Sequence, residues 1–303
     1  ISSSILFLTL VTFQKKNRFT TIVGIIIVVV TAFDLLRFGW KFTPFTQKSY
    51  LFPSTKVLAF LQKNLGEFRI MSTDSRILPP NFSAIYRLKS VDGYDPLYLL
   101  RYGELIAASG RKKADINPPF GFNRIITPHN YDSKIIDLLG VKFILSLSDL
   151  KSDKLIKVFQ EGETRIYENV NVTPRLFFVL EAIYINDKKE AIRSIFDQDT
   201  SLMESAIVEF TQGGVSVPPL RWKVGELRWK VGEAEITHYS ENKIVINTKN
   251  AGDGFLVLTD SYYPTWHAVI DGIEAKIYRT DYNFRGVIVP SGKHKVEFYN
   301  SLF

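Results

Sequence analysis

The segment 91–98 combines carboxylates and aromatic rings at a spacing that suits contact with a sugar. It reads Val-Asp-Gly-Tyr-Asp-Pro-Leu-Tyr, so Asp92, Tyr94 and Asp95 stand close together. Carboxylates accept hydrogen bonds from hydroxyl groups, and an aromatic ring stacks on the apolar face of a sugar. The alternative is structural, because an Asp-Pro pair is also typical of the start of a helix, which Asp95 would cap.

Two further clusters place aromatic and charged side chains near predicted strand ends. Residues 262–266 read Tyr-Tyr-Pro-Thr-Trp, and residues 281–285 read Asp-Tyr-Asn-Phe-Arg. Loops at the ends of a β-sandwich commonly carry binding residues, although packing in the core and at corners explains the same residue types. We therefore take five residues as candidate substrate-binding residues, namely Asp92, Tyr94, Asp95, Trp266 and Arg285.

The sequence lacks the common motifs of catalysis, metal binding and cofactor binding. It has no cysteine, and its four histidines are scattered singly, with no His-Glu-x-x-His pattern. It also lacks the Gly-x-Ser-x-Gly elbow, the phosphate-binding P-loop and the Gly-x-Gly-x-x-Gly fingerprint. We predict no catalytic, cofactor-binding or metal-binding residue in this chain, and we expect His294, on the apolar face of its strand, to be a satisfied core histidine.

The elements that position these residues fall into two groups, the first of which mixes helices and strands. Apolar residues at helical spacing follow residues 53–55 and end near Gly66, and residues 68–71 then read as a strand. Residues 98–108 predict a helix, and residues 134–139 predict another that Gly140 closes before a strand at 141–145. This alternation is typical of an α/β layer.

From about residue 176 the pattern is mostly β. One more helix is predicted at 187–196, and strands separated by Gly, Pro and Asn follow it. Asp271-Gly272 between two strand-like runs is a strong hairpin signal, and a turn at 290–293 connects the last two strands. The overall prediction is an α+β fold with a C-terminal antiparallel β-sandwich or jelly-roll-like domain.

A tandem repeat of seven residues occupies 221–234, as Arg-Trp-Lys-Val-Gly-Glu-Leu and then Arg-Trp-Lys-Val-Gly-Glu-Ala. Two copies that each contain a glycine, just after Pro218-Pro219, do not favour a coiled coil. We interpret the repeat as a duplication in a tolerant edge loop, with a binding role for its two tryptophans as the alternative.

The N-terminal part predicts a membrane anchor. Residues 19–36 carry a single charge, Asp34, and include a run of nine residues that leaves no polar face. A second apolar stretch at 5–13 reads as the end of an earlier helix, and the basic loop 14–18 between them is typical of the cytoplasmic side. We therefore expect residues after 41 to be extracytoplasmic, and the chain to be a fragment of a longer protein.

Composition defines the expected partners and domains. The net charge of +7 arises from cations spread among acids, which argues against nucleic acid and favours an anionic membrane or cell-wall polymer. The residues outside the membrane suffice for one large or two modest cores. We expect two, which gives a transmembrane part at 1–40, an α/β domain at 41–175 and a β-sandwich domain at 176–303.

Four stretches resemble the C-terminal part of the YfhO-type bacterial membrane proteins, a family similar to the polyprenyl-phosphate-sugar-dependent glycosyltransferases of the C superfamily. They are residues 92–97, residues 138–145, residues 167–169 with Pro174-Arg175, and residues 262–266 followed by Asp271-Gly272, Tyr278-Arg279 and residues 283–285. The departures are Thr265, where the family usually has glycine before tryptophan, and the doubled seven-residue unit.

The resemblance implies a multi-pass protein of the cell membrane with an extracytoplasmic domain near its end. It also implies that the catalytic acid lies upstream of Ile1, so that this fragment supports transfer of a lipid-phosphate-linked sugar to a cell-envelope glycopolymer without catalysing it. The alternative is a non-enzymatic, membrane-anchored module for carbohydrate binding, assembly or transport. A hydrolase is disfavoured, since no nucleophile, metal or acid pair can be named.

Overall fold

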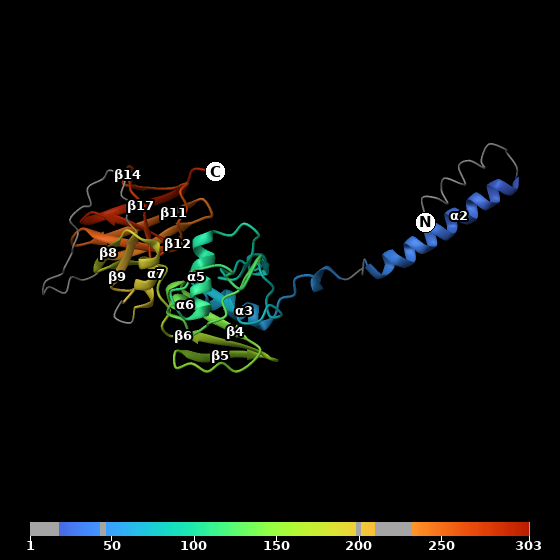
Figure 1. Cartoon of the computed structure of the whole chain (residues 1–303), viewed down its shortest axis with the longest axis horizontal. Coiled ribbons are helices and arrows are strands. Elements are labelled where there is room, and N and C mark those ends of the chain that lie inside the picture. Colours follow the sequence, from blue (N-terminus) through green and yellow to red (C-terminus); the bar gives the residue numbers. More distant parts are fainter. Residues whose placement is uncertain (1–17, 43–46, 198–200, 210–231, 303) are drawn as a thin grey trace. The chain divides into compact units, whose positions relative to one another are not determined.

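The computed structural model describes residues 18–42, 47–197, 201–209 and 232–302. The chain divides into two units, Ile1–Ser54 and Thr55–Phe303 (Figure 1). The apolar stretch 5–13, most of the basic loop 14–18 and all but the last three residues of the tandem repeat lie outside the described residues.

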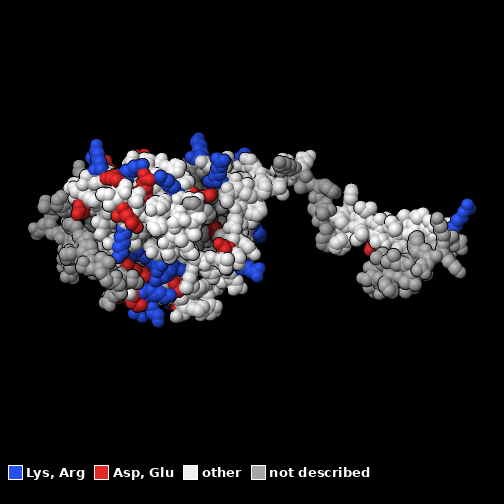
Figure 2. Space-filling view, turned by 90° about the horizontal axis from the view of Figure 1, so that it is seen from above, with Lys and Arg blue, Asp and Glu red and all other residues white. Residues whose placement is uncertain are grey.

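The first unit contains helix α2 (Arg18–Phe42) and a short 3₁₀ helix, η1 (Lys48–Tyr50). Residues 21–40 of α2 have a mean hydropathy of 2.2, and none of the most apolar part is buried in the protein. Figure 2 shows that the helix surface is uncharged over most of its length. Within the described part of the chain, α2 is the one helix long and apolar enough to cross a bilayer.

A four-stranded sheet lies between helices in the N-terminal part of the second unit. Its order is β1-β4-β6-β5, with β1 and β4 parallel and the other pairs antiparallel. Helix α3 packs on one face through Leu61, while α5 and α6 pack on the other through Leu105 and Ile135. The bounds are β1 (Arg69–Ser72), β4 (Val141–Ser146), β5 (Leu155–Glu161), β6 (Thr164–Asn169), α3 (Lys56–Asn64), α5 (Leu100–Arg111) and α6 (Lys134–Leu138).

Local sequence signals set the ends of these helices. The Thr55 side chain accepts a hydrogen bond from the backbone N–H of Leu58 and so caps α3, and Ser133 caps α6 in the same way. Gly140 has φ +67° between α6 and β4, which confirms the predicted glycine stop. Helix α5 begins at Leu100 rather than at residue 98, and its N-cap position is Leu99, so Asp95 does not cap it.

The C-terminal part is a sandwich of two sheets, with orders β7-β12-β16-β15-β9-β8 and β10-β11-β17-β13-β14. Side chains of both sheets, including Leu256, Val287 and Phe298, form the core between them. The bounds are β7 (Leu176–Val179), β8 (Glu181–Ile185), β9 (Ser205–Glu209), β10 (Glu233–Tyr239), β11 (Lys243–Asn250), β12 (Gly254–Ser261), β13 (Trp266–Ile270), β14 (Ile273–Ala275), β15 (Tyr278–Thr280), β16 (Phe284–Val289) and β17 (Gly292–Asn300). The pairing is antiparallel except for β8 and β9, which helix α7 (Lys188–Phe196) connects.

Two predicted turns are present, with different outcomes. Asp271 and Gly272 both have positive φ, at 52° and 85°, and join β13 to β14 as a hairpin. The turn at 290–293 instead carries the chain from β16 in one sheet to β17 in the other. His294 follows it and is satisfied as predicted, because its Nδ1 lies 2.6 Å from Asp271 Oδ2, but it lies at the sandwich rim rather than in the core.

One core joins the two parts of the second unit. Tyr282 and Phe284, from the sandwich, pack in the same cluster as residues of α5 and α6. The remaining short elements are α4 (Phe82–Ile85), β2 (Gly93–Tyr94) and β3 (Ile125–Ile126). The structure is therefore α+β, as predicted, whereas the predicted boundary between domains at 175/176 stays a prediction.

Candidate functional site

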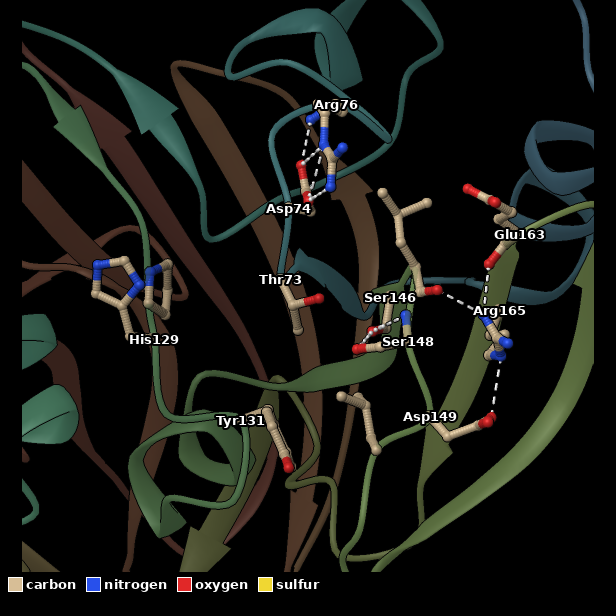
Figure 3. A pocket seen from close by; sticks show the side chains of 13 residues that line it. Thr73, Asp74, Arg76, His129, Tyr131, Ser146, Ser148, Asp149, Glu163 and Arg165 are labelled. Carbon is tan, nitrogen blue, oxygen red and sulfur yellow. Dashed lines mark hydrogen bonds and ion pairs between the residues drawn. The ribbon is translucent and has the colours of Figure 1, made fainter.

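A polar pocket of about 710 Å³ opens at the carboxyl ends of the parallel strands β1 and β4. Thr73 and Asp74 follow β1 directly, and Ser146 and Ser148 lie at the end of β4 (Figure 3). Parallel neighbours bring their carboxyl ends to one edge of a sheet, and ligands of α/β folds commonly bind at such an edge. We call this the edge pocket.

The other walls of the edge pocket come from three separate segments. The loop before α6 provides His129 and Tyr131, the loop after β4 provides Asp149, and the β5–β6 hairpin provides Glu163 and Arg165 (Figure 3). No dashed line in Figure 3 joins His129 or Tyr131 to the other lining residues. Their polar groups are therefore not engaged within the pocket.

Two carboxylates of the edge pocket are held ionised by their neighbours. Arg76 binds Asp74 through two nitrogens, Nε at 3.0 Å and Nη2 at 2.6 Å, and these hydrogen bonds lower the pKa of Asp74 to about 2. The Tyr167 hydroxyl donates to Asp149 at 3.1 Å, and Arg165 Nε lies 2.9 Å from the same oxygen, so the pKa of Asp149 is also lowered. At neutral pH both groups accept hydrogen bonds and neither has a proton to donate.

Arg165 is fixed at the pocket wall by the backbone. Its Nη1 donates to the carbonyl oxygens of Leu147 at 2.6 Å and Glu163 at 2.8 Å. This anchoring limits the rotamers of the guanidinium, so that the cation stays beside Asp149. The edge pocket therefore presents fixed charges of both signs beside several hydroxyl groups.

Asp92 lies on a second, smaller cavity of about 220 Å³, whose wall also includes Arg69 and Tyr102. Its Oδ2 accepts hydrogen bonds from Ser72 N at 2.9 Å and Ser90 Oγ at 3.2 Å, while its buried Oδ1 has no partner. Burial raises the pKa of Asp92 to about 7. Ser72, which donates to Asp92, directly precedes Thr73 of the edge pocket, but the two cavities share no lining residue.

Tyr94 and Asp95 are exposed and line neither cavity. The backbone of Tyr94 is hydrogen-bonded to the Asn81 side chain, and the Asp95 carboxylate accepts from Leu97 N at 2.8 Å. The structure does not bring these two residues together with Trp266 or Arg285. A substrate contact at either residue stays a prediction.

Trp266 and Arg285 are in direct contact. The guanidinium carbon of Arg285 lies 4.0 Å from the centroid of the indole ring, in cation–π geometry. Arg285 is buried, which lowers its pKa to about 10, and its Nη2 lies 3.2 Å from Asp260 Oδ2. Neither residue lines the two cavities described above. Contact of this pair with a substrate therefore also stays a prediction.

Asp260 is the centre of a buried charge cluster that the sequence did not reveal. Its Oδ1 pairs with Arg69 at 2.8 Å and with Arg175 at 2.6 Å, while its Oδ2 pairs with Arg285. Burial by itself would raise the pKa of Asp260, but the three positive charges together lower it. The partners are far apart in sequence. Arg285 is a candidate residue from the sequence and Arg175 belongs to the Pro174-Arg175 pair, but the sequence connects neither to Asp260.

The sequence also did not identify the edge pocket. The missed residues are Thr73, Asp74, Arg76, His129, Tyr131, Ser146, Ser148, Asp149, Glu163 and Arg165. A usable signal was present, because polar residues directly follow both strands predicted at 68–71 and 141–145. The sequence did not show that these two strands pair in parallel, side by side in one sheet.

Comparison with known proteins links the C-terminal sandwich to a membrane protein family. Residues 228–300 match the family model of the bacterial membrane protein YfhO. No curated protein and no solved structure matches the chain. The matched segment includes Trp266 and Arg285 but none of the edge pocket, and it is consistent with a YfhO-type membrane protein, as the resemblance indicated.

Proposed function

We propose that this chain, which is similar to YfhO over residues 228–300, is the C-terminal extracytoplasmic part of a multi-pass membrane protein of the glycosyltransferase-C-like kind. The whole protein transfers a sugar from a lipid-phosphate carrier to a cell-envelope acceptor. The unit Thr55–Phe303 binds the carbohydrate acceptor in the edge pocket and presents it to the membrane-embedded site.

The composition of the edge pocket is the observation that carries the assignment. A sugar presents many hydroxyl groups, each of which both donates and accepts hydrogen bonds. The pocket offers ionised acceptors at Asp74 and Asp149, a fixed donor at Arg165, and hydroxyl groups at Ser148 and Tyr131. Its volume of about 710 Å³ lies within the range of small-ligand sites.

The same geometry argues against glycoside hydrolysis in the edge pocket. The common two-carboxylate hydrolysis of a glycosidic bond needs a carboxylic acid that stays protonated near neutral pH. Asp74 and Asp149 have lowered pKa values, and so they do not meet that requirement. A non-enzymatic carbohydrate-binding module is the second candidate function, since the edge pocket offers hydrogen-bonding groups for a sugar without a proton donor for cleavage.

The test is saturation-transfer NMR of the full chain in lipid nanodiscs with glucose, galactose, N-acetylglucosamine and chitobiose. We expect at least one of these sugars to give a signal that Asp149→Ala abolishes. Asp153→Ala is the matched control, since Asp153 is exposed, lies four residues further along the same loop and does not line the pocket. Absence of signal for all four sugars, or equal loss in both variants, would remove the edge pocket from acceptor binding.

A second assay separates the two candidate functions. Membranes containing the full-length gene product are incubated with a radiolabelled polyprenyl-phosphate sugar and the acceptor that binds. Transfer of label to the acceptor supports the transferase. Binding without transfer supports the module.

A further inference from the structure

We infer that an exposed apolar patch on the second unit, formed by Tyr94, Leu97, Leu100 and Ile125, is a second membrane contact that lies in the interface of the bilayer spanned by α2. We call these four residues the apolar patch. Its exposed fractions are 87% for Leu97, 59% for Leu100, 45% for Tyr94 and 44% for Ile125.

Strand pairing and hydrogen bonds place the four residues of the patch near one another. Tyr94 in β2 is directly opposite Ile125 in β3. The next residue, Asp95, donates its backbone N–H to the carbonyl of Arg124 at 2.9 Å and binds Leu97 N through its side chain. Leu100, three residues after Leu97, begins α5. The four side chains therefore come from the two-stranded sheet of β2 and β3 and from the turn that leads into α5.

The patch is costly in water and suited to an interface. Full exposure of a leucine forgoes about 1.5–3 kcal/mol of burial free energy, and this patch exposes two. The neighbouring Tyr98 shows that the turn can direct a side chain inward, because its ring packs against Phe122 and the core. Tyrosine at the edge of an apolar surface is typical of the headgroup region of a bilayer.

The rim of the patch carries two arginines and one carboxylate, since Asp95, between Tyr94 and Leu97, is also exposed. Arg124 directly precedes Ile125 and is exposed. Arg87, also exposed, follows α4, and Asn81 at the start of α4 is hydrogen-bonded to Tyr94. A cation near an anionic lipid surface contributes about 1 kcal/mol of attraction. Two arginines against one carboxylate leave the rim with a small excess of positive charge, which fits an anionic bilayer better than an uncharged protein surface.

The short connection between α2 and the second unit makes the bilayer a partner within reach of the apolar patch. Helix α2 ends at Phe42, and the second unit begins at Thr55. Thirteen residue steps span at most about 45 Å when fully extended. Anchoring through α2 thus keeps the second unit near the bilayer surface, where even a weak contact is populated because binding is intramolecular.

The absence of cysteine in the chain permits a clean test. Full-length chain with Leu97→Cys is labelled with an environment-sensitive fluorophore and reconstituted into vesicles of phosphatidylglycerol and phosphatidylethanolamine. Ile273→Cys is the matched control, because Ile273 is also apolar and 75% exposed but lies in the sandwich hairpin. We expect blue-shifted emission at position 97 and at least twofold stronger quenching by nitroxide-labelled lipid than at position 273.

Two results would overturn the inference. Emission at position 97 that matches position 273 would show that the patch faces water. Blue-shifted emission without quenching by lipid would show that protein, such as a second copy of the chain, covers the patch. A second variant tests the rim, since Arg124→Glu is expected to reduce lipid quenching at position 97, with the larger reduction at low ionic strength.

Discussion

The hydroxyl of Tyr282 donates a hydrogen bond to the carboxylate of Glu104, and both side chains are buried although 178 residues separate them. Tyr282 stands in the turn between β15 and β16, and Glu104 stands in α5. Lys188 Nζ binds the other oxygen of Glu104 at 2.6 Å, and the Arg101 guanidinium lies 4.5 Å from the centroid of the tyrosine ring. This contact connects the sandwich to the helix layer that covers the sheet of the edge pocket.

Tyr282→Phe is expected to destabilise the protein by about 1.5–3 kcal/mol, because it removes a hydrogen bond to a buried charged group. Tyr184→Phe is the matched control. The Tyr184 hydroxyl is buried without a partner, so its removal is expected to be neutral or stabilising. Urea unfolding of the full chain in detergent, followed by fluorescence, measures both. Equal effects of the two variants would contradict the assignment.

Asp260→Asn is expected to cost about 3–5 kcal/mol, since it leaves three buried arginines without their shared counter-charge. The comparison is Glu235→Gln, an exposed carboxylate on β10, for which we expect a change within about 0.5 kcal/mol. The same unfolding experiment applies. A loss below 1 kcal/mol for Asp260→Asn would mean that the arginines are compensated by other groups.

The buried carboxyl group of Asp281 is expected to lower the free energy of unfolding as pH rises. It is fully buried, its Oδ1 accepts from Ile207 N at 2.8 Å, its Oδ2 has no partner, and burial raises its pKa to about 7. Between the unfolded pKa near 4 and the folded pKa, the folded state binds more protons. Stability therefore falls by about 1.4 kcal/mol per pH unit across this window and levels off above it.

Asp281→Asn removes this contribution, so the stability of the variant relative to the wild type is expected to rise between pH 5 and pH 8. Asp74→Asn is the control, because the pKa of Asp74 is about 2 and its ionisation is complete throughout that range. Unfolding midpoints at pH 5, 6, 7 and 8 test this. Parallel profiles for wild type and Asp281→Asn would refute the burial effect.

Gly286→Ala is expected to destabilise by about 1–3 kcal/mol through overpacking. An added Cβ would lie 2.4 Å from ring atoms of Phe255 and 2.4 Å from the Thr280 hydroxyl. Gly110→Ala is the opposite case, because its Cβ meets open space within α5, and we expect stabilisation of up to about 1 kcal/mol. Melting temperatures of the two variants should move in opposite directions.

Val30→Lys tests the membrane span, since Val30 lies in the middle of the apolar part of α2. A lysine at the centre of a spanning helix costs roughly 3 kcal/mol of insertion free energy. We expect a smaller proportion of the Val30→Lys protein than of the Val30→Leu protein to stay in the membrane during alkaline extraction. Equal extraction of the two variants would argue that α2 does not span the bilayer.

Local signals predicted much of the fold. The turn at Asp271-Gly272, the stop at Gly140 and the apolar helix all depend on residues close in sequence, and the structure has each of them. The start of α5 was wrong by two residues, because Asp95 forms a turn with Leu97 instead of a cap. Such errors arise where one side chain has two local partners of similar energy.

The sites were less predictable because they depend on distant pairing. The edge pocket exists because β1 and β4, about 70 residues apart, are parallel neighbours. Asp260 looks unremarkable in sequence, since its three arginines lie in β1, before β7 and in β16. Of the predicted site residues, Trp266 and Arg285 do lie together, and both belong to the segment that matches YfhO.

The bond between Arg69 and Asp260 also sets an order of events during synthesis. Arg69 belongs to β1, the first of the described strands, yet its guanidinium binds groups 190 and 191 residues later. At roughly 5–20 residues per second, a ribosome needs about 10–40 s to supply those partners. During that interval the guanidinium of Arg69 has no Asp260 carboxylate to bind, so the charge cluster is completed only after most of the second unit has been made.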